Sequence, residues 1–260
     1  MIHATAVVDS RAQLGPNVAV GPYAVIDGDV QIGEGSSIGP HVHLTGHTTI
    51  GRNNRFHTGC VIGDEPQDLK YRGEPTRLRI GDGNTFREHV TVHRSRMIEE
   101  ETRVGNGNLL MAHSHVGHNC VLGDQIILAN GALLGGHSIV EDRAFISGNC
   151  LVHQFARVGK MALMQGGSAI SKDLPPFTVA RGDNGIAGLN TIGLRRAGMD
   201  SAARLELRRL YHRLFRSGLK LKDAVAQARV EFSGEAARHM IEFIASTSRG
   251  VCRDMAQAAD

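Results

Sequence analysis

Histidine and glycine recur between residues 115 and 154 in an arrangement that suits proton transfer. The histidines are His115, His118, His137 and His153, and three glycines, Gly117, Gly135 and Gly136, lie among them. An imidazole with an ordinary pKa of about 6.5 can take a proton from a hydroxyl near neutral pH while that oxygen attacks a thioester. A backbone N–H left open beside a glycine can then hold the oxyanion that forms. No serine or cysteine is an evident nucleophile in this group, which favours direct transfer over a covalent acyl-enzyme.

These residues must be positioned by secondary structure, and a six-residue repeat indicates which kind. Counting in steps of six from Ile2 to Ile170 gives 29 positions, of which only Asp68 and Glu74 are not apolar. A chain that is 41% hydrophobic would give about 12 apolar residues there by chance. The residue two places before each position is mostly small, and glycine often follows it. Each unit therefore predicts a short strand, one large and one small inward side chain, and a tight corner that glycine occupies without strain.

Three such units would close a triangular coil of 18 residues, and coils would stack at about the 4.8 Å spacing of neighbouring strands. Residues 18 apart then lie above one another, so His118 is expected beneath Gly136, and Gly136 beneath Gln154. His115 falls just before the same corner. The spacing therefore predicts that four residues gather at this corner within about 10 Å: His118, His137, His153 and Gln154.

Two polar stretches interrupt the repeat and are expected to loop out of the coil. They are residues 64–79 and residues 94–103, and Ile98 in the second stretch is interpreted as a chance match to the repeat. Long loops on a rigid scaffold are where binding residues tend to lie.

The repeat ends near Lys172, and the rest of the chain has the pattern of helices joined to the coil by a glycine-rich connection at 182–190. The expected helices are one that starts at Asp200 or Ser201 and ends before Gly218, a second over about 221–231 and a third over about 234–246. We therefore expect a mainly β protein, with a β-helix over 1–182 and a small C-terminal α-helical domain over 183–260. Between residues 189 and 222, nine Lys or Arg stand against Asp200 and Glu206, so this stretch carries a charge of +7.

Composition fits a solenoid of short strands. The 260 residues include 32 glycines and no tryptophan, and the aromatic share of 4% is low. The charged and hydrophobic content excludes a disordered chain. No apolar run approaches the roughly 20 residues of a membrane span, and the N-terminus lacks a signal-peptide core, so a cytoplasmic protein is expected. A net charge of +3 does not by itself imply a nucleic-acid partner.

Cys60, Cys120 and Cys150 occupy the small inward position and are expected to fill the core without disulfides.

Several longer motifs make the chain resemble the UDP-N-acetylglucosamine acyltransferases, a family of hexapeptide-repeat enzymes. The motifs are NLLMAHSHVGHNC at 108–120, GGH at 135–137, VHQF at 152–155, DLKYRGEPT at 68–76 and STSRG at 246–250. The resemblance implies a left-handed parallel β-helix and a homotrimer with sites between subunits. It implies transfer of an R-3-hydroxyacyl chain from the phosphopantetheine of acyl carrier protein to the 3-hydroxyl of UDP-N-acetylglucosamine, the first step of lipid A synthesis, with no metal or redox cofactor.

The resemblance also assigns roles to particular residues. His118 matches the general base and Gly136 the oxyanion amide. The residues that match substrate contacts are His137 and Gln154 beside the sugar and acyl group, His153 in the acyl channel, Asp68 and Lys70 on the first loop, and Asn190 and Arg196 for the uridine and phosphates. His115, next to the corner, is counted with the substrate-binding residues. Gly166 falls where the family sets acyl length, and a glycine there implies a longer channel. The basic stretch would attract the acidic carrier protein.

Three positions depart from the family pattern. Asn119 stands where many relatives have an aspartate, Ile192 where some have a glutamate, and Ala197 where they have a second arginine. An amide can orient an imidazole but cannot stabilise imidazolium charge as a carboxylate does. The changes at Ile192 and Ala197 bear on nucleotide affinity and on the preferred sugar, so a UDP-sugar with a 3-amino group stays open as an alternative acceptor.

Other functions are known on the same scaffold and stay as alternatives. A zinc carbonic anhydrase would use His113 and His118 with a third histidine at position 77, which is Arg77. The later N-acyltransferase of the same pathway carries a uridine-binding domain before the helix, and we expect none because the repeat begins at Ile2. Acetyltransferases that use acetyl-CoA share the fold, and a non-enzymatic scaffold that docks a partner through its basic tail is a further alternative.

Overall fold

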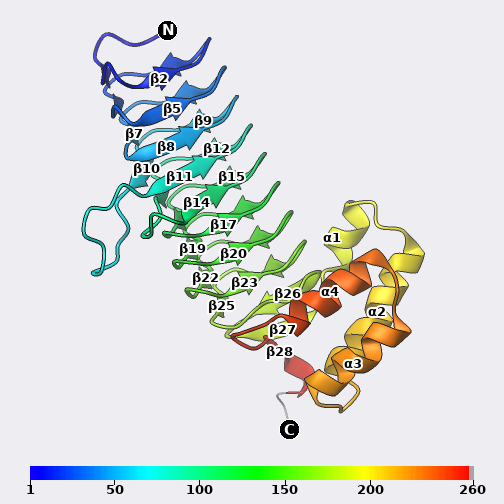
Figure 1. The fold of residues 1–260 in the computed structure, drawn as a ribbon. Helices are drawn as coiled ribbons and strands as arrows, with labels where there is room; N and C mark the ends of the chain where they lie inside the picture. The colour runs from blue at the N-terminus through cyan, green and yellow to red at the C-terminus, as the bar shows by residue number, and fades with distance from the viewer. Residues whose placement is uncertain (258–260) are drawn as a thin grey trace.

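A three-sided column of short parallel strands forms the larger part of the molecule, with a group of helices at its C-terminal end (Figure 1). The computed structural model describes residues 1–257. The column is the left-handed parallel β-helix that the resemblance implied, and each face is one sheet, named here after its first strand. The β1 sheet contains β1 (Val7–Val8), β4 (Val25–Ile26), β7 (His43–Leu44), β10 (Val61–Asp64), β13 (Thr91–His93), β16 (His115–Val116), β19 (Leu133–Leu134), β22 (Leu151–Val152) and β25 (Ala169–Ile170).

The other two faces repeat this arrangement. The β2 sheet contains β2 (Gln13–Leu14), β5 (Val30–Ile32), β8 (His47–Ile50), β11 (Arg77–Ile80), β14 (Glu101–Val104), β17 (Val121–Leu122), β20 (Ile139–Val140) and β23 (Arg157–Val158). The β3 sheet contains β3 (Ala19–Val20), β6 (Ser37–Ile38), β9 (Arg55–Phe56), β12 (Thr85–Phe86), β15 (Leu109–Leu110), β18 (Ile127–Leu128), β21 (Phe145–Ile146), β24 (Leu163–Met164), β26 (Thr178–Arg181), β27 (Gly185–Leu189) and β28 (Arg253–Asp254).

Strand pairing confirms the 18-residue coil. Val116 pairs with Leu134, and Leu134 with Val152. Across the first loop Ile50 pairs with Ile80, thirty residues on, which is twelve more than one coil. Across the second loop Ile80 pairs with Val104, twenty-four residues on, which is six more than one coil. Both insertions are multiples of six, and for that reason the apolar frame continues through them.

The inward positions are buried as the repeat predicts. Phe56 and Phe86 stack inside the column with ring centroids 4.7 Å apart. Ile98 is 48% exposed in the second loop, which confirms that its place in the repeat is accidental. All four cysteines are buried and free, and burial raises the pKa of the Cys60 thiol to about 12. These thiols are therefore core groups without reactive thiolate character.

One inward feature was not expected from the sequence. Buried asparagines replace the usual small residue on three successive coils, and their side chains bind the backbone of the next coil. Asn84 N donates to Asn54 Oδ1 at 2.9 Å, and Asn108 N donates to Asn84 Oδ1 at 2.9 Å. This ladder satisfies amide groups that would otherwise be unpaired in the core.

Glycine at the corners has a different cause from the one expected. At Gly33 a side-chain carbon would lie 2.6 Å from the backbone carbon of Gly51 on the next coil, so glycine there permits close stacking of coils. The left-handed backbone conformation falls instead two residues later in most units, and often on residues other than glycine. Asn119, with φ of 58°, and His137, with φ of 59°, are examples. Asparagine and histidine tolerate this conformation better than most residues.

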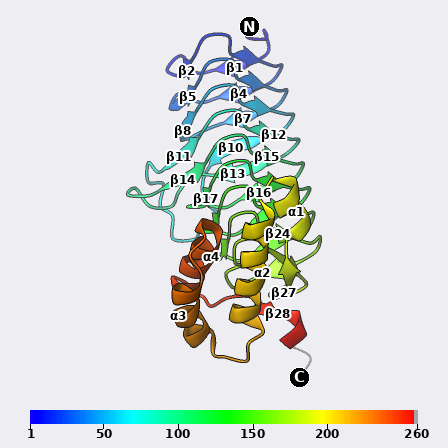
Figure 2. The same ribbon diagram turned by 90° about the vertical axis from the view of Figure 1, so that its right-hand side faces the viewer.

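The C-terminal helices are α1 (Thr191–Arg196), α2 (Ser201–Phe215), α3 (Leu221–Glu231) and α4 (Glu235–Ala245), followed by the 3₁₀ turn η1 (Met255–Gln257). The three predicted helices are confirmed, and Asp200 caps α2 by accepting a hydrogen bond from Ala203 N at 2.9 Å. Figure 2 shows α2, α3 and α4 side by side at the end of the column. Among the described helices, none is both long and apolar enough to cross a bilayer.

Several elements differ from the sequence expectation. Residues 77–79 and 101–103 were expected to be parts of the two loops, but they lie in β11 and β14, where pairing within the β2 sheet draws them back into the column. The segment 182–190 was expected to be a connection, but β27 lies within it and pairs antiparallel with β26. The residues Gly182 and Asn184, both with positive φ, form the turn between these strands. Glycine lowers strand propensity, and here pairing with β26 and β28 outweighs it. Helix α1 is only six residues long, too short for its periodicity to be recognised.

Candidate active site

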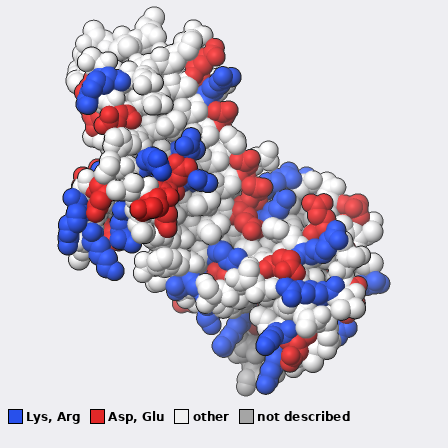
Figure 3. Space-filling model, viewed as in Figure 1, with Lys and Arg blue, Asp and Glu red and all other residues white. Residues whose placement is uncertain are grey.

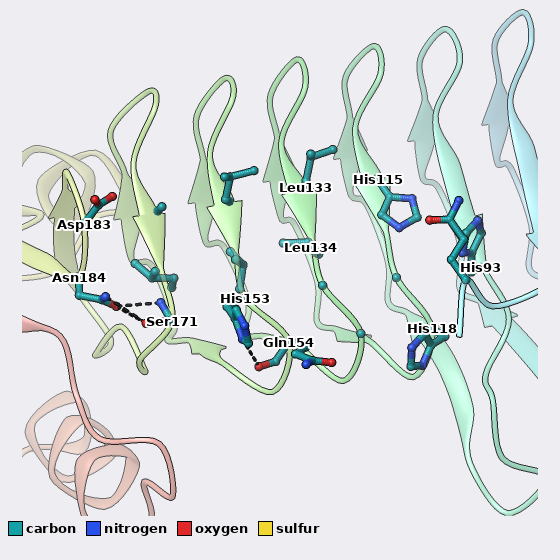
Figure 4. A pocket seen from close by; sticks show the side chains of 18 residues that line it. His93, His115, His118, Leu133, Leu134, His153, Gln154, Ser171, Asp183 and Asn184 are labelled. Atoms are coloured by element: carbon teal, nitrogen blue, oxygen red, sulfur yellow. Dashed lines mark hydrogen bonds between the residues drawn. The ribbon is translucent and has the colours of Figure 1, made fainter. Parts of the chain in front are cut away.

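A groove of about 690 Å³ follows the outer face of the β1 sheet (Figure 4). Five predicted site residues line it, namely His115, His118, Gly136, His153 and Gln154. His137 packs the edge of its ring against His118, with ring centroids 5.1 Å apart. The predicted stacking is confirmed, since His137 N donates to His118 O at 2.8 Å and Phe155 N donates to Gly136 O at 3.0 Å.

The hydrogen bonds of Asn119 fix which nitrogen of His118 carries a proton. Asn119 Oδ1 receives the backbone N–H of Arg96 at 2.9 Å, so this atom is an acceptor. The same oxygen lies 2.8 Å from His118 Nδ1, which must therefore donate. In the neutral imidazole the lone pair is then on Nε2.

Gly136 lies directly beside this nitrogen. A side-chain carbon built on Gly136 would lie 2.6 Å from His118 Nε2. Any residue other than glycine at this position would therefore push the His118 ring out of its observed position. The neighbouring amides are occupied, because Gly135 N donates to Val152 O and His137 N donates to His118 O. The Gly136 N–H donates to no other residue of the described part of the chain. A base and an open backbone donor thus meet at one corner, as general-base attack on a carbonyl requires.

The imidazoles around His118 are held neutral. Burial, and then the nearby His93 and His118, lower the pKa of His115 to about 4. Burial also lowers the pKa of His93 and of His137. Thr91 Oγ1 lies 2.7 Å from His115 Nδ1 and fixes that ring. His118 therefore faces neutral imidazole neighbours at pH 7.

The sequence did not identify His93 as part of this groove. His93 is 6% exposed, and its ring packs edge-on against His115 with centroids 4.8 Å apart. The insertion at 94–103 lies between the two residues, so stepping by 18 from His93 leads to Met111 instead. The pairing of β13 with β16 places Thr91 opposite His115, and His93, two residues after Thr91, reaches His115 through its ring.

An outward apolar stripe extends the groove towards the helical end. Leu133, Leu151 and Ala169 stack on β19, β22 and β25, and the two leucines are 41% and 49% exposed. The sequence offered a signal, because leucine repeats at an outward position 18 residues on. Exposed leucines stacked in this way are suited to an alkyl chain. Asp183, Asn184 and Ser171 form the far end.

The first loop approaches the same corner. Asp68 pairs with Arg96 of the second loop at 3.1 Å, and Gln67 lines the groove. The backbone N–H of Lys70, followed by the charges of Arg96 and His118, lowers the pKa of Asp68. Lys70 itself is exposed and does not line the groove.

Three predicted residues lie away from His118. Asn190 and Arg196 line a second groove, of about 740 Å³, on the β3 sheet beside α1. There Asn190 caps α1, accepting from Gly193 N at 3.0 Å, and its Nδ2 donates to Met161 O. Gly166 lines neither groove, and a side-chain carbon there would contact Gly148 O at 3.5 Å. A single chain therefore carries two separate sets of predicted site residues.

The basic stretch is partly neutralised. Arg213 pairs with Glu231 and Arg216 with Asp254, at 2.9 and 2.7 Å. Arg208 and Arg209 on α2 are exposed and make no ion pair with any described residue. Figure 3 shows Lys and Arg interspersed with Asp and Glu over the helical end.

The residues considered for zinc are not together. His113 stacks on His89 at another corner, with centroids 5.2 Å apart, and Arg77 on β11 donates to Ile98 O. Within residues 1–257, no three His, Cys, Asp or Glu side chains are grouped so as to hold a metal ion.

Comparisons with known proteins agree along the whole chain. The family model described as UDP N-acetylglucosamine O-acyltransferase, domain 2, matches residues 173–252, and the bacterial transferase hexapeptide model matches 11–46 and 29–64. Curated relatives named acyl-[acyl-carrier-protein]–UDP-N-acetylglucosamine O-acyltransferase occur in Janthinobacterium sp., with 48% identity, and Halorhodospira halophila, with 44%. Each match covers 97% of this chain and 99% of the relative.

The solved UDP-N-acetylglucosamine acyltransferase of Francisella novicida superposes with a TM-score of 0.95 at 35% identity, covering 100% of this chain and 96% of that one. The solved UDP-N-acetylglucosamine acyltransferase of Arabidopsis superposes with a TM-score of 0.86 at 33% identity. This match covers 97% of this chain and 100% of that one.

Proposed function

The chain belongs to the acyl-[acyl-carrier-protein]–UDP-N-acetylglucosamine O-acyltransferase family, and from this premise we propose that His118 is the general base of the transfer and Gly136 its oxyanion donor. Members of this family move an acyl group from acyl carrier protein to UDP-N-acetylglucosamine in lipid A biosynthesis. The observation that carries the proposal is the lone pair of His118 Nε2 lying over Gly136, whose N–H is open.

The proposed reaction is a single displacement through a tetrahedral intermediate. His118 Nε2 takes the proton of the sugar 3-hydroxyl while that oxygen attacks the thioester carbonyl of the acyl-phosphopantetheine. The Gly136 N–H holds the oxyanion. Collapse of the intermediate forms the ester, breaks the C–S bond and returns the proton from His118 to the leaving thiolate. The products are the 3-O-acyl sugar nucleotide and the free thiol of the carrier protein.

The groove supports the placement of the acyl chain. Leu133, Leu151 and Ala169 offer an apolar wall that starts beside His115, in the same groove as His118, and the 3-hydroxyacyl chain is proposed to lie along it. Gln154 and His153 lie at the same corner of the column as His118, two coils further on, and they line the groove together with this wall, so they can contact the polar head of the chain.

We propose further that the cytoplasmic enzyme is a homotrimer whose sites are completed between chains. Asn190 and Arg196 line a groove on the β3 sheet, whereas His118 lies at the edge of the β1 sheet. Around a threefold axis parallel to the column, the β1 sheet of one chain can face the β3 sheet of the next. The groove with Arg196 would then supply the groups for the uridine and phosphates.

The test is an assay of purified protein with UDP-N-acetylglucosamine and a series of 3-hydroxyacyl carrier proteins, in which product mass reports donor and acceptor together. His118→Ala is expected to lose at least about 100-fold in kcat while still binding the nucleotide. His113→Ala, at another corner, is the matched control and keeps full activity. An active His118→Ala variant would remove His118 from the mechanism. A parallel assay with the 3-amino sugar nucleotide tests the alternative acceptor.

A further inference from the structure

Asn119 connects the proposed base to a carboxylate on the second loop. It is 6% exposed, and its Oδ1 accepts hydrogen bonds from His118 Nδ1 and from Arg96 N. Its Nδ2 donates a short hydrogen bond to Glu100 Oε2. The imidazole, the amide and the carboxylate thus form one continuous hydrogen-bonded chain.

The second loop is fixed to the column where it meets Asn119. Asn119 N donates to Thr102 Oγ1 at 2.8 Å, and the buried Ser95 hydroxyl donates to Glu100 O at 2.8 Å. Glu101, the next residue, pairs with Arg79 and Arg103 at 3.1 and 2.8 Å. These contacts hold the Glu100 carboxylate at Asn119, although half of its side chain is exposed.

Glu100 is also the carboxylate near His118 that forms no ion pair with a Lys or Arg among the described residues. The charged and titratable groups near His118 are Asp68, His93, His115 and His137, together with Glu100 and Arg96, which act on the neighbouring ring of His137. Asp68 and Arg96 form an ion pair, and the three histidines are neutral at pH 7 because burial lowers the pKa of each. Among described residues, Glu100 has only His137 within ion-pair distance, at 3.8 Å.

We propose that Glu100 is a positioning residue for His118, acting through Asn119. As His118 takes the proton, its ring becomes an imidazolium, and Asn119 offers only a dipole to it. The carboxylate of Glu100 polarises the amide of Asn119. Its negative charge stabilises the imidazolium of His118 through that amide, without touching the ring. This inference rests on the proposed role of His118 as base.

The test moves the negative charge between the two positions. Glu100→Gln keeps an acceptor for Asn119 Nδ2 but removes the charge, and Asn119→Asp places two carboxylates against each other. The double variant Glu100→Gln/Asn119→Asp puts one carboxylate directly on His118 Nδ1, with the amide introduced at position 100 donating to it. Glu99→Gln is the matched control, because Glu99 lies on the same loop without a hydrogen bond or ion pair to any described residue.

Glu100→Gln is expected to lower kcat about tenfold, with KM for UDP-N-acetylglucosamine unchanged. Loss of the charge makes the imidazolium less stable, so the acid limb of the pH profile of kcat/KM moves to lower pH. Asn119→Asp alone is expected to be impaired, and the double variant recovers to within about threefold of the wild type. Glu99→Gln matches the wild type in both respects.

Two outcomes would overturn the inference. One is a Glu100→Gln variant whose kcat and pH profile equal those of the wild type, and the other is a double variant no more active than either single one. Thermal melting of every variant separates these outcomes from misfolding. If His118→Ala is inactive while Glu100→Gln is normal, only the role of Glu100 fails. If His118→Ala is active, the proposed base fails as well.

Discussion

His118 Nε2 lies 2.6 Å from the point where a side-chain carbon on Gly136 would stand. The two residues are 18 apart in the chain, so their contact is a direct product of one turn of the coil. The same stacking that buries the apolar frame therefore places a proton acceptor against an open backbone N–H. No loop movement is needed to bring these two groups together.

Gly136→Ala tests this contact. The added methyl collides with His118 Nε2 and must displace the ring, and a displacement of about 1 Å at a reacting group can cost about 100-fold in rate. We expect a loss of that size in kcat, with nucleotide binding retained, measured by transfer assay and by calorimetry. A shift in thermal stability should be small, because the clash is with a side chain that can rotate away. Wild-type turnover in this variant would show that the ring does not need its observed position.

The corner with His118, Gly136 and Gln154 could be predicted from sequence because stacking in a regular coil depends only on residue count. The helices α2, α3 and α4 could be predicted because they are long enough for capping and periodicity to be recognised. Such features are local or strictly periodic. The handedness of the coil came from the resemblance to known proteins.

What the sequence could not show depends on loops and on neighbouring coils. Glu100 reaches Asn119 only because the chain between β13 and β14 loops out where the β1 and β2 sheets meet, and no repeat governs that path. His93 was missed because the same insertion shifts it out of the 18-residue count. Asn190 and Arg196 were carried over from the resemblance, and their separation from His118 becomes visible only in three dimensions.

Mixing two inactive variants tests whether sites form between chains. His118→Ala and Arg196→Ala chains, co-expressed with different tags and purified as mixed trimers, would regenerate intact sites wherever His118 of one chain meets Arg196 of the next. Each mixed trimer then contains one intact site out of three, so about a third of the wild-type activity is expected. Activity of mixed trimers is measured against each variant alone. Mixed trimers with no more activity than the single variants would place the whole site within one chain.

Gly166→Met tests the expectation that glycine at this position leaves a long acyl channel. A side-chain carbon at Gly166 makes only an ordinary contact with Gly148 O, so the protein should fold normally. We expect the preference to move to shorter 3-hydroxyacyl chains by at least two carbons, measured by competition between carrier proteins of different acyl length. Gly166→Ala serves as the control with a smaller change. An unchanged chain-length profile in the methionine variant would exclude Gly166 from the channel.

Arg157→Ala tests how the helical domain is held to the column. Arg157 pairs with the buried Asp173 at 2.8 Å, donates to Phe243 O and lies over the Phe243 ring. Removing it leaves an uncompensated buried carboxylate, which costs about 3 kcal/mol. We expect a lower melting temperature, and partial recovery in Arg157→Met/Asp173→Asn, where no charge remains. Equal melting of Arg157→Ala and the wild type would mean that other contacts of α4 suffice.

Reversing charge on α2 tests recognition of the acidic carrier protein. Arg208 and Arg209 are exposed and lie within the stretch that carries +7, whereas Arg213 and Arg216 are engaged with acids. Steering by such a surface acts on association, so Arg208→Glu/Arg209→Glu is expected to raise KM for the acyl carrier protein about tenfold and to leave kcat unchanged. The dependence of kcat/KM on salt should weaken at the same time, because screening acts on the attraction that has been removed. Arg238→Glu is the control. Arg238 is an exposed residue of α4, and this substitution reverses a charge outside the basic stretch. A KM for the carrier protein that is equal in the double variant and in Arg238→Glu would place carrier docking on another surface.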